Sequence, residues 1–286
     1  MNNIIVINKE KGYTSRDIVN IAQKVYKTKK VGHTGTLDPI AEGVLIICMN
    51  KALKVAEFIT SDIKEYIATL TLGFETDTLD ITGKTIYTSS KKVNKEEVKK
   101  VLNDFIGKYN QEVPKYSAVK VNGKKLYEYA RNNIDIKLPK KEVTIYNIEL
   151  ISDITDNKFK IKCLVSKGTY IRSLIRDIGR KLETYATMDS LIRTKQGEID
   201  ISMTSSIKEL KENKAKTYKI DEILKLPKIK ITDETILKKV KNGANIDVDI
   251  KDNKVFIVDK LDNIIAIYEK INKNEAKLLK MIDNSY

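Results

Sequence analysis

Residues 32–43 form the most unusual stretch of the chain, with the sequence GHTGTLDPIAEG. Three glycines, two threonines and a proline describe a tightly specified loop, in which Pro39 favours an extended conformation for Asp38. Such a loop can hold one carboxylate in a fixed pose, where it can act as a nucleophile or a base. An ordinary turn, whose aspartate caps nearby backbone, accounts for these residues equally well. A P-loop is excluded, because the four-residue gap and the Gly-Lys-Ser/Thr ending are missing.

A second candidate stretch, residues 166–177, reads as a turn that leads into a helix. The free N–H groups at the start of a helix can bind an anion, and Arg172 in the first turn can pair with a carboxylate or a phosphate. Four of the six arginines in the chain lie between residues 172 and 193. Arginine offers a planar, always charged fork that lysine lacks, so this cluster indicates a site. A solvated row of arginines is the alternative.

A third stretch, residues 76–80, contains two aspartates and follows an alternating segment at residues 65–72. The alternation predicts a strand that places Tyr66 on the same face as three aliphatic side chains. The two aspartates, taken alone, are most simply turn formers.

Hydrophobic periodicity predicts the elements that must position these stretches. We expect strands at residues 3–7, 65–72, 116–121, 143–151 and 159–165, a helix capped by Ser15, a helix capped by Asn94, and a helix over residues 171–182. Strands and helices follow one another in irregular order, which favours an α+β fold over a doubly wound parallel sheet.

The chain length predicts about two domains. We expect a catalytic domain over residues 1–226, in which residues 124–141 form a polar, basic, mobile insertion and residues 204–226 form a connector. Short strand patterns separated by Asn/Asp turns predict a small β-rich domain over residues 227–286.

Composition narrows the partner class. Lysines and arginines number 53 against 39 acidic residues, which gives a net charge of +14 and favours a polyanionic partner. His33 is the sole histidine, and Cys48 and Cys163 are far apart, so neither a zinc cluster of usual spacing nor a disulfide framework is expected. The apolar runs are too short for a membrane span or a signal peptide, so we expect a soluble, cytoplasmic protein.

Five blocks together resemble the TruB family of tRNA pseudouridine synthases. The blocks are residues 32–45 (GHTGTLDPIAEGVL), 9–15, 76–83, 111–131 and 166–193, in the same order as in the family. The resemblance implies a pseudouridine-synthase-type catalytic domain with a mixed, mainly antiparallel sheet. It implies, more weakly, a PUA-like RNA-binding domain at the C-terminal end.

The same resemblance implies a cofactor-free isomerase that converts uridine 55 in the T loop of tRNA to pseudouridine, after flipping the base into a pocket. Its partner would be the T arm and elbow of tRNA, with no obligatory protein partner, and the enzyme would be a monomer. No metal site is implied. The departures from the family pattern are Glu10, Val113 and Ile199, and none of them touches the expected chemistry.

Site residues follow from the matched motifs. By resemblance, Asp38 is the catalytic aspartate, Tyr66 lies against the target base, and Arg172 pairs with the aspartate and keeps it ionised. The expected substrate-binding residues are His33, which displaces bases of the T loop, the pocket residues Tyr170 and Leu191, and the basic residues Lys9, Lys120 and Arg131.

Two other function classes stay open. An RNA-binding module or tRNA folding chaperone would explain the charge and the β-rich end, and either role can coexist with catalysis. A nucleotidyltransferase would read residues 32–35 as a nucleotide loop, but a second histidine is absent.

Overall fold

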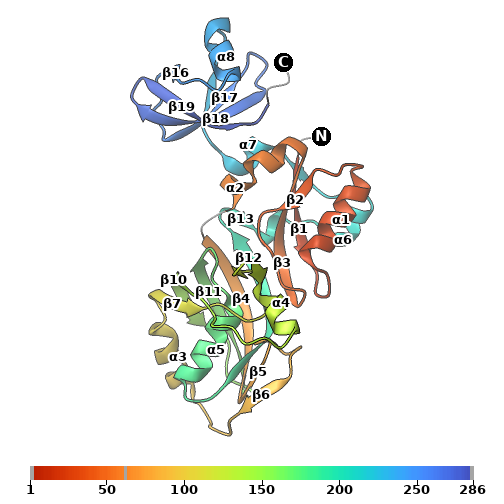
Figure 1. The fold of residues 1–286 in the computed structure, drawn as a ribbon, viewed down its shortest axis with the longest axis vertical. Coiled ribbons are helices and arrows are strands. Elements are labelled where there is room, and N and C mark those ends of the chain that lie inside the picture. The colour runs from red at the N-terminus through yellow and green to blue at the C-terminus, as the bar shows by residue number, and fades with distance from the viewer. Residues whose placement is uncertain (1–2, 61–62, 284–286) are drawn as a thin grey trace.

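The computed structural model describes residues 3–60 and 63–283 of the chain. A large sheet and a smaller C-terminal sheet follow one another along the long axis of the molecule (Figure 1). The elements up to residue 226 are β1 (Ile4–Lys9), α1 (Ser15–Val25), β2 (Val31–His33), β3 (Ala41–Met49), the 3-10 helix η1 (Asn50–Val55), α2 (Ala56–Ile59), β4 (Ile63–Leu72), β5 (Phe74–Thr76), β6 (Thr85–Thr88), α3 (Lys95–Asn103), β7 (Gly107–Glu112), β8 (Lys120–Val121), β9 (Lys124–Lys125), α4 (Leu126–Arg131), β10 (Lys140–Leu150), β11 (Lys158–Ser166), α5 (Ile171–Lys181), β12 (Ala186–Gln196), β13 (Ile199–Asp200), the 3-10 helix η2 (Ile201–Met203), α6 (Ile207–Lys211), β14 (Thr217–Tyr218) and α7 (Ile220–Leu224). The elements beyond it are β15 (Lys228–Lys230), α8 (Glu234–Lys241), β16 (Ile246–Asp247), β17 (Lys254–Val258), β18 (Ile264–Asn272) and β19 (Glu275–Met281).

The large sheet has the strand order β14-β1-β3-β12-β4-β11-β10-β7, with β2 added to β3 and β13 added to β12. Neighbouring strands are antiparallel except for β3 and β12, which run parallel at the centre. Together with the helices, this confirms the expected α+β fold with a mixed, mainly antiparallel sheet. The strand β12 was not anticipated from the sequence, although it joins the two halves of the sheet.

The central strand β3 explains how the two faces of the sheet are covered. All of its residues except Glu42 are buried. Side chains such as Leu45 and Ile47 join the main core with α1, α3 and α5, whereas Val44 and Ile46 join a second core with η1, α7 and the C-terminal sheet. A strand buried on both faces needs an almost continuous apolar sequence, which β3 has.

The strand β4 confirms the predicted alternation. Tyr66, Ala68, Leu70 and Leu72 are buried in the main core, and the intervening residues are partly exposed. The helix α5 packs on the same core through Leu174, Ile175 and Ile178. Burial of one strand face and one helix stripe therefore sets the position of α5 over β4 and β12.

Helix caps are only partly as expected. Asn94 caps α3 through a capping box, as predicted. Ser15 does not cap α1. The cap is Thr14, whose side chain accepts a hydrogen bond from the Asp17 N–H within a capping box, and Ser15 is the first helical residue. The buried Ser15 hydroxyl instead bonds Leu37, in the loop that carries Asp38.

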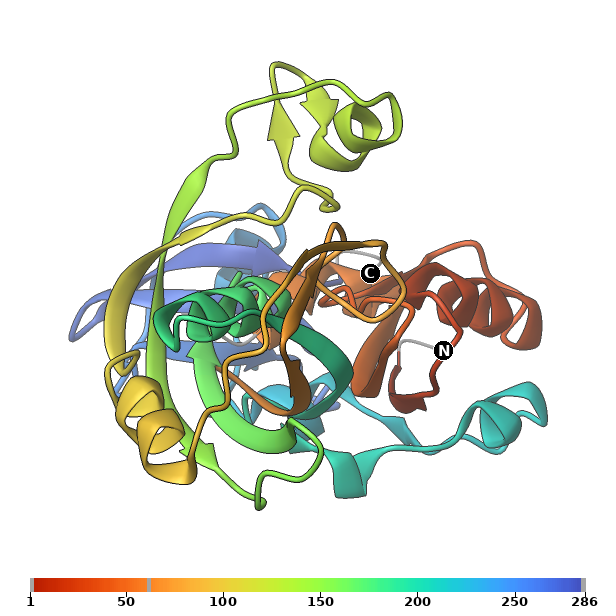
Figure 2. The ribbon, with the colours of Figure 1, turned by 90° about the horizontal axis from the view of Figure 1, so that it is seen from below.

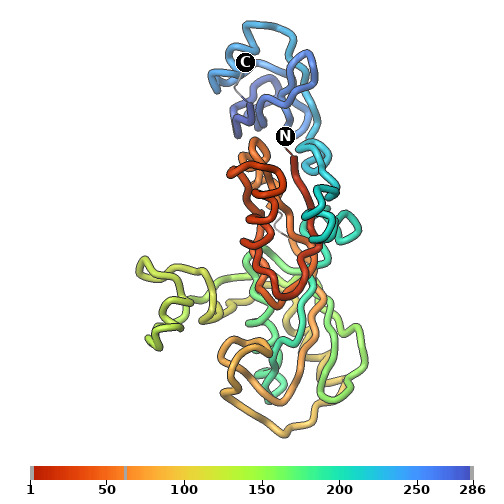
Figure 3. The backbone as a smooth tube through the Cα atoms, turned by 90° about the vertical axis from the view of Figure 1, so that its right-hand side faces the viewer, coloured from red at the N-terminus to blue at the C-terminus, as the bar shows by residue number. Residues whose placement is uncertain are grey.

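The segment from residue 113 to residue 139 forms an arm that stands away from both sheets (Figures 2 and 3). It contains the hairpin β8–β9 and the helix α4. The prediction of a strand over residues 116–121 is therefore wrong for most of its length. Only Lys120 and Val121 form a strand, and residues 113–119 are a loop. The insertion expected over residues 124–141 includes α4, and its last two residues already belong to β10.

The C-terminal sheet has the order β15-β17-β18-β19-β16, with β15 and β17 parallel and the other pairs antiparallel. The sequence did not reveal β15, α8 or β19.

The prediction that residues 204–226 form a connector is also wrong. In this segment β14 adds to the edge of the large sheet beside β1, and α6 packs against α1. No helix in the described residues is long and apolar enough to span a membrane.

Candidate active site

The loop between β2 and β3 is held from three sides. Ser15 at the start of α1 donates to the Leu37 carbonyl at 3.2 Å and accepts from the Leu37 N–H at 2.9 Å. The Gly12 N–H donates to the Pro39 carbonyl at 2.8 Å, and the Ala41 N–H donates to the Asp38 carbonyl at 3.0 Å. These hydrogen bonds hold Asp38 in a fixed position, as the composition of the loop predicts.

Lys9 also stabilises the loop that carries Asp38. Its ammonium donates to the carbonyls of Glu10 at 3.0 Å and Tyr13 at 2.7 Å, with Pro39 further off at 3.5 Å. The side chain is fully buried, and burial lowers the pKa of Lys9 to about 8. The expectation that Lys9 contacts RNA does not fit this placement. Its role in this structure is to hold the loop.

Arg193 on β12 grips the other end of the loop. Its guanidinium donates to the carbonyls of Val44 at 2.8 Å, Gly35 at 3.0 Å and Thr36 at 3.5 Å, and the residue is 1% exposed. The backbones of β3 and β12 come so close that a Cβ on Gly43 would lie 2.3 Å from the Arg193 carbonyl oxygen. Gly43 also has a φ of +100°, so both sterics and conformation demand glycine there.

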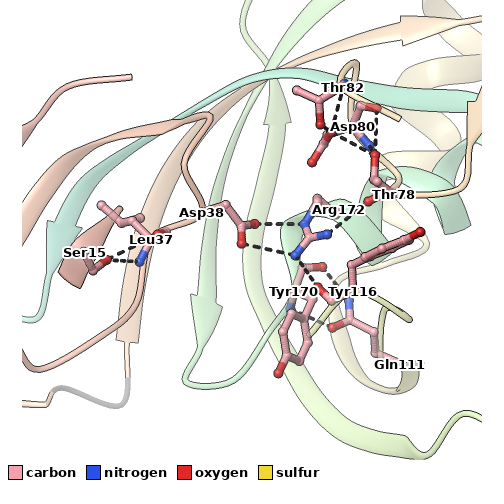
Figure 4. A network of polar contacts seen from close by, with 10 residues as sticks. All are labelled: Ser15, Leu37, Asp38, Thr78, Asp80, Thr82, Gln111, Tyr116, Tyr170 and Arg172. Atoms are coloured by element: carbon pink, nitrogen blue, oxygen red, sulfur yellow. Dashed lines mark hydrogen bonds and ion pairs between the residues drawn. The ribbon is translucent and has the colours of Figure 1, made fainter. Parts of the chain in front are cut away.

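Asp38 and Arg172 form a two-point ion pair (Figure 4). The Arg172 Nε lies 2.9 Å from Asp38 Oδ2, and Nη2 donates to Oδ1 at 3.2 Å. The arginine side chain is 7% exposed, whereas the carboxylate is 36% exposed. The pair therefore presents its carboxylate side to an incoming group. The alternatives of a backbone-capping aspartate and a solvated arginine row do not describe these two residues.

Arg172 also ties together two further segments. Its Nη1 donates to the Thr78 carbonyl at 3.0 Å, and its Nη2 donates to the Tyr116 carbonyl at 3.1 Å, at the base of the arm. The loop that supplies Thr78 is ordered by Asp80, whose Oδ1 accepts from the hydroxyls of Thr78 and Thr82. Asp80 is thus the turn former that the sequence indicated, and its loop orients the guanidinium.

The cavity beside this pair measures about 610 Å³. Its walls include the expected residues Tyr66, Tyr170 and Leu191, together with Tyr116 and Tyr127 of the arm. In the sheet, Tyr66 pairs with Arg193, and Leu191 pairs with both Ala68 and Ala41, which explains how β4, β12 and the Asp38 loop converge. Burial raises the pKa of Tyr66 and of Tyr170, so both phenols are neutral near pH 7. They supply apolar ring faces with polar tips.

Four of the expected substrate-binding residues lie outside the cavity lining: Lys9, described above, and His33, Lys120 and Arg131. His33 is on β2, half-buried, with burial and the nearby Arg16 lowering its pKa, and its Nδ1 has no hydrogen-bond partner among the described residues. Lys120 on β8 and Arg131 at the end of α4 are exposed on the arm. The Arg131 guanidinium lies 5.3 Å from the ring centre of Tyr127, which lines the cavity.

Sequence reasoning left several contributors unassigned. Arg193 lay within the arginine cluster, which was the signal that could have singled it out. Tyr116 contributes only its carbonyl to Arg172, and a main-chain contact leaves no mark in a sequence. In the described part of the chain, no cluster of three or more His, Cys, Asp or Glu side chains could hold a metal ion.

Comparisons with known proteins identify related sequences and a related fold. Residues 23–171 match the model of the TruB family pseudouridylate synthase N-terminal domain. The chain is 43% identical to a tRNA pseudouridine synthase B from Staphylococcus aureus, with 93% of this chain and 94% of the relative covered. It is 50% identical to another from Fusobacterium nucleatum, over 70% of each chain. A solved chain in a Cbf5-Nop10-Gar1 complex shares the fold, with a TM-score of 0.71 at 24% identity, covering 98% of this chain and 85% of that one.

Proposed function

The chain belongs to the TruB family of pseudouridylate synthases and is therefore an isomerase, and we propose that it converts uridine 55 in the T loop of tRNA to pseudouridine. The observation that carries the proposal is the Asp38–Arg172 pair on the wall of an aromatic-lined cavity. A cavity of this size falls in the range of about 300–1,000 Å³ that small ligand groups occupy. The relatives named tRNA pseudouridine synthase B support tRNA as the substrate.

The reaction breaks the bond between C1′ and N1 of uridine, turns the uracil, and joins it to C1′ through C5. The C5 hydrogen leaves as a proton and N1 gains one, so the change is an isomerisation with no redox step. The Asp38 carboxylate can attack the base, attack C1′ or remove a proton from the sugar, and each step requires the ionised form. Arg172 holds the carboxylate in place through two contacts and leaves it partly exposed.

The target base must leave the folded T loop before it can react. Extraction of a stacked base costs a few kcal/mol, which stacking against an aromatic side chain offsets. In our proposal Tyr66 supplies this surface, with Tyr170 and Leu191 on the neighbouring walls. Lys120 and Arg131 place positive charge on the exposed surface of the arm, where they would contact phosphates of the T arm and elbow, and Arg131 lies beside the cavity residue Tyr127. The net charge of +14 fits a salt-sensitive RNA complex.

Tritium release tests the proposed function directly. A tRNA transcript labelled with tritium at uridine C5 should lose label from one T-loop uridine when it meets the wild-type protein, because that hydrogen leaves as C5 becomes the glycosidic carbon. A transcript in which only uridine 55 is replaced by cytidine is the matched control and should release none. Salt-sensitive binding without release from the wild-type substrate would support an RNA-binding module or folding chaperone instead.

We propose that His33 fills the space that the extracted bases leave. His33→Ala should then lower kcat/KM on folded tRNA by about 10-fold or more, and on an isolated T arm with a loosened loop by less than about threefold, since less base displacement is needed there. Initial rates on the two substrates measure this difference. Equal losses on both would rule out base displacement as the role of His33.

A further inference from the structure

Gln111 on β7 makes a two-way hydrogen-bonded pair with the backbone of Tyr170 (Figure 4). Its Oε1 accepts from the Tyr170 N–H at 2.8 Å, and its Nε2 donates to the Tyr170 carbonyl at 3.1 Å. Nε2 also lies 2.5 Å from the hydroxyl oxygen of Tyr109. The residue is 1% exposed, so the amide is fully used inside the protein and does not face the cavity.

The site of this contact is the first turn of α5. Tyr170 is the N-cap residue of α5, and its own side chain makes no capping hydrogen bond. Its carbonyl also accepts from the Leu174 N–H at 3.0 Å, so Gln111 grips the peptide groups on both sides of the residue where the helix begins. The N–H groups at the start of a helix have no partner within the helix and must find one elsewhere. Here the side-chain amide of Gln111, on the strand β7, supplies that partner and fixes the position and direction of α5.

Arg172 lies only two residues further along α5. Its guanidinium must meet Asp38, Thr78 and Tyr116 at distances of 2.9–3.2 Å. The Tyr170 ring lines the cavity from the same turn. A shift of the helix start would therefore displace the ion pair and one cavity wall together, and misplacement by about 1 Å can cost about 100-fold in rate.

We propose that Gln111 is a positioning residue for the reaction, which sets Arg172 and Tyr170 through the backbone at the start of α5. This inference rests on the proposed function for its kinetic consequence. Gln111 touches neither the substrate nor the reacting atoms. It acts through the two hydrogen bonds, and a side chain that restores both should restore the rate.

Substitution by glutamate turns this requirement into a pH dependence. A protonated glutamate can accept from the Tyr170 N–H and donate to its carbonyl, as glutamine does, whereas a carboxylate cannot donate. Burial would raise the pKa of that glutamate above the ordinary value of about 4.3. Gln111 contacts Tyr109 on β7 and pairs with Lys141 on β10, and the groups that act on the Tyr109 hydroxyl are Cys163 on β11 and Arg176 and Asp177 on α5. All of these are also present in the wild type, so the ratio of variant to wild-type kcat isolates residue 111.

Gln111→Glu and Gln111→Met are compared with the wild type between pH 5.5 and 8, by tritium release under saturating tRNA. We expect Gln111→Met to lose about 10-fold in kcat at every pH, with KM changed by less than about twofold, because positioning acts on the transition state. Gln111→Glu should match that loss at pH 8 and recover toward the wild-type kcat as the pH falls. A Gln111→Glu ratio that stays flat with pH, or a Gln111→Met kcat within twofold of the wild type, would overturn the proposal.

Tyr109→Phe is the matched control, because it removes the third contact of the Gln111 amide and leaves the pair with Tyr170 in place. We expect its kcat to stay within about twofold of the wild type, since the Tyr170 backbone keeps both of its hydrogen bonds. A loss equal to that of Gln111→Met would assign the effect to the Tyr109 contact instead.

Amide hydrogen exchange separates a failure of this inference from a failure of the proposed function. In protein labelled with ¹⁵N-tyrosine, the Tyr170 amide is assigned by its disappearance in Tyr170→Phe. Its exchange should accelerate at least about 10-fold in Gln111→Met and much less in Gln111→Glu, which keeps the acceptor. This readout needs no turnover. An unchanged Tyr170 exchange rate in Gln111→Met would overturn the positioning role even if the enzyme proved active on another RNA.

Discussion

Asp38→Asn is expected to lower the rate of tritium release from C5-labelled tRNA by at least about 100-fold, because a carboxamide is neither a nucleophile nor a base. Asparagine has nearly the same shape as aspartate and can still accept a hydrogen bond from Arg172. The loop that carries residue 38 is held by Ser15, Lys9 and Arg193, none of which contacts the Asp38 side chain in a hydrogen bond. The fold and tRNA affinity should therefore persist.

The matched control is Glu42→Gln, which neutralises the one partly exposed residue of β3, four positions further along. Glu42 is outside the cavity lining, so its kcat should stay within about twofold of the wild type. Single-turnover rates measure the chemical step, and filter binding measures tRNA affinity. Intact-mass spectrometry excludes deamidation of the introduced asparagine to aspartate. An Asp38→Asn protein of correct mass that turns over at the wild-type rate would remove Asp38 from the chemistry.

The sequence was informative where burial and periodicity coincide. The alternation in β4, the apolar stripe of α5 and the helix cap at Asn94 all appear in the structure as predicted. The strand β12 was missed because its sequence, ATMDSLIRTKQ, alternates poorly. Its Arg193 and Gln196 are buried polar residues, which bond Gly35 and Thr34 of the loop that carries Asp38 instead of packing in an apolar core. These polar contacts to the loop thus interrupt the hydrophobic pattern of β12.

Some of the residues that line the cavity could be singled out from the sequence, and others could not. Asp38 and Arg172 stood out because a glycine-rich loop and a local arginine cluster are rare features that a surface does not need. Lys9 could not be told from the many solvated lysines, because its burial depends on the loop carbonyls that surround it. Tyr116 acts through its carbonyl oxygen, which every residue possesses. Contacts made by the main chain become visible only once the strands that converge on them are known.

Arg172→Lys is expected to reduce kcat by about 100-fold while the protein still folds, because lysine cannot reproduce the fork that joins three segments. The guanidinium uses Nε and Nη2 for Asp38, Nη1 for Thr78 and Nη2 again for Tyr116. An ammonium group carries its three donors on one nitrogen, whereas the guanidinium reaches these acceptors with three separate nitrogens. A lysine that keeps its charge near Asp38 would therefore lose contacts to the carbonyls of Thr78 and Tyr116. Single-turnover rates and thermal unfolding measure the two effects.

Arg180→Lys is the matched control, on the same helix and in the same row. Arg180 makes an equally forked pair with Glu75, with Nε–Oε2 at 3.0 Å and Nη2–Oε1 at 2.6 Å, but it lies outside the cavity lining. We expect the control to keep kcat within about threefold, so that loss of a forked pair alone does not explain the effect. If Asp38 and Arg172 act as one unit, Arg172→Lys combined with Asp38→Asn should be no slower than Asp38→Asn alone. A wild-type kcat for Arg172→Lys would show that charge near Asp38 suffices and that the fork contributes nothing to the reaction.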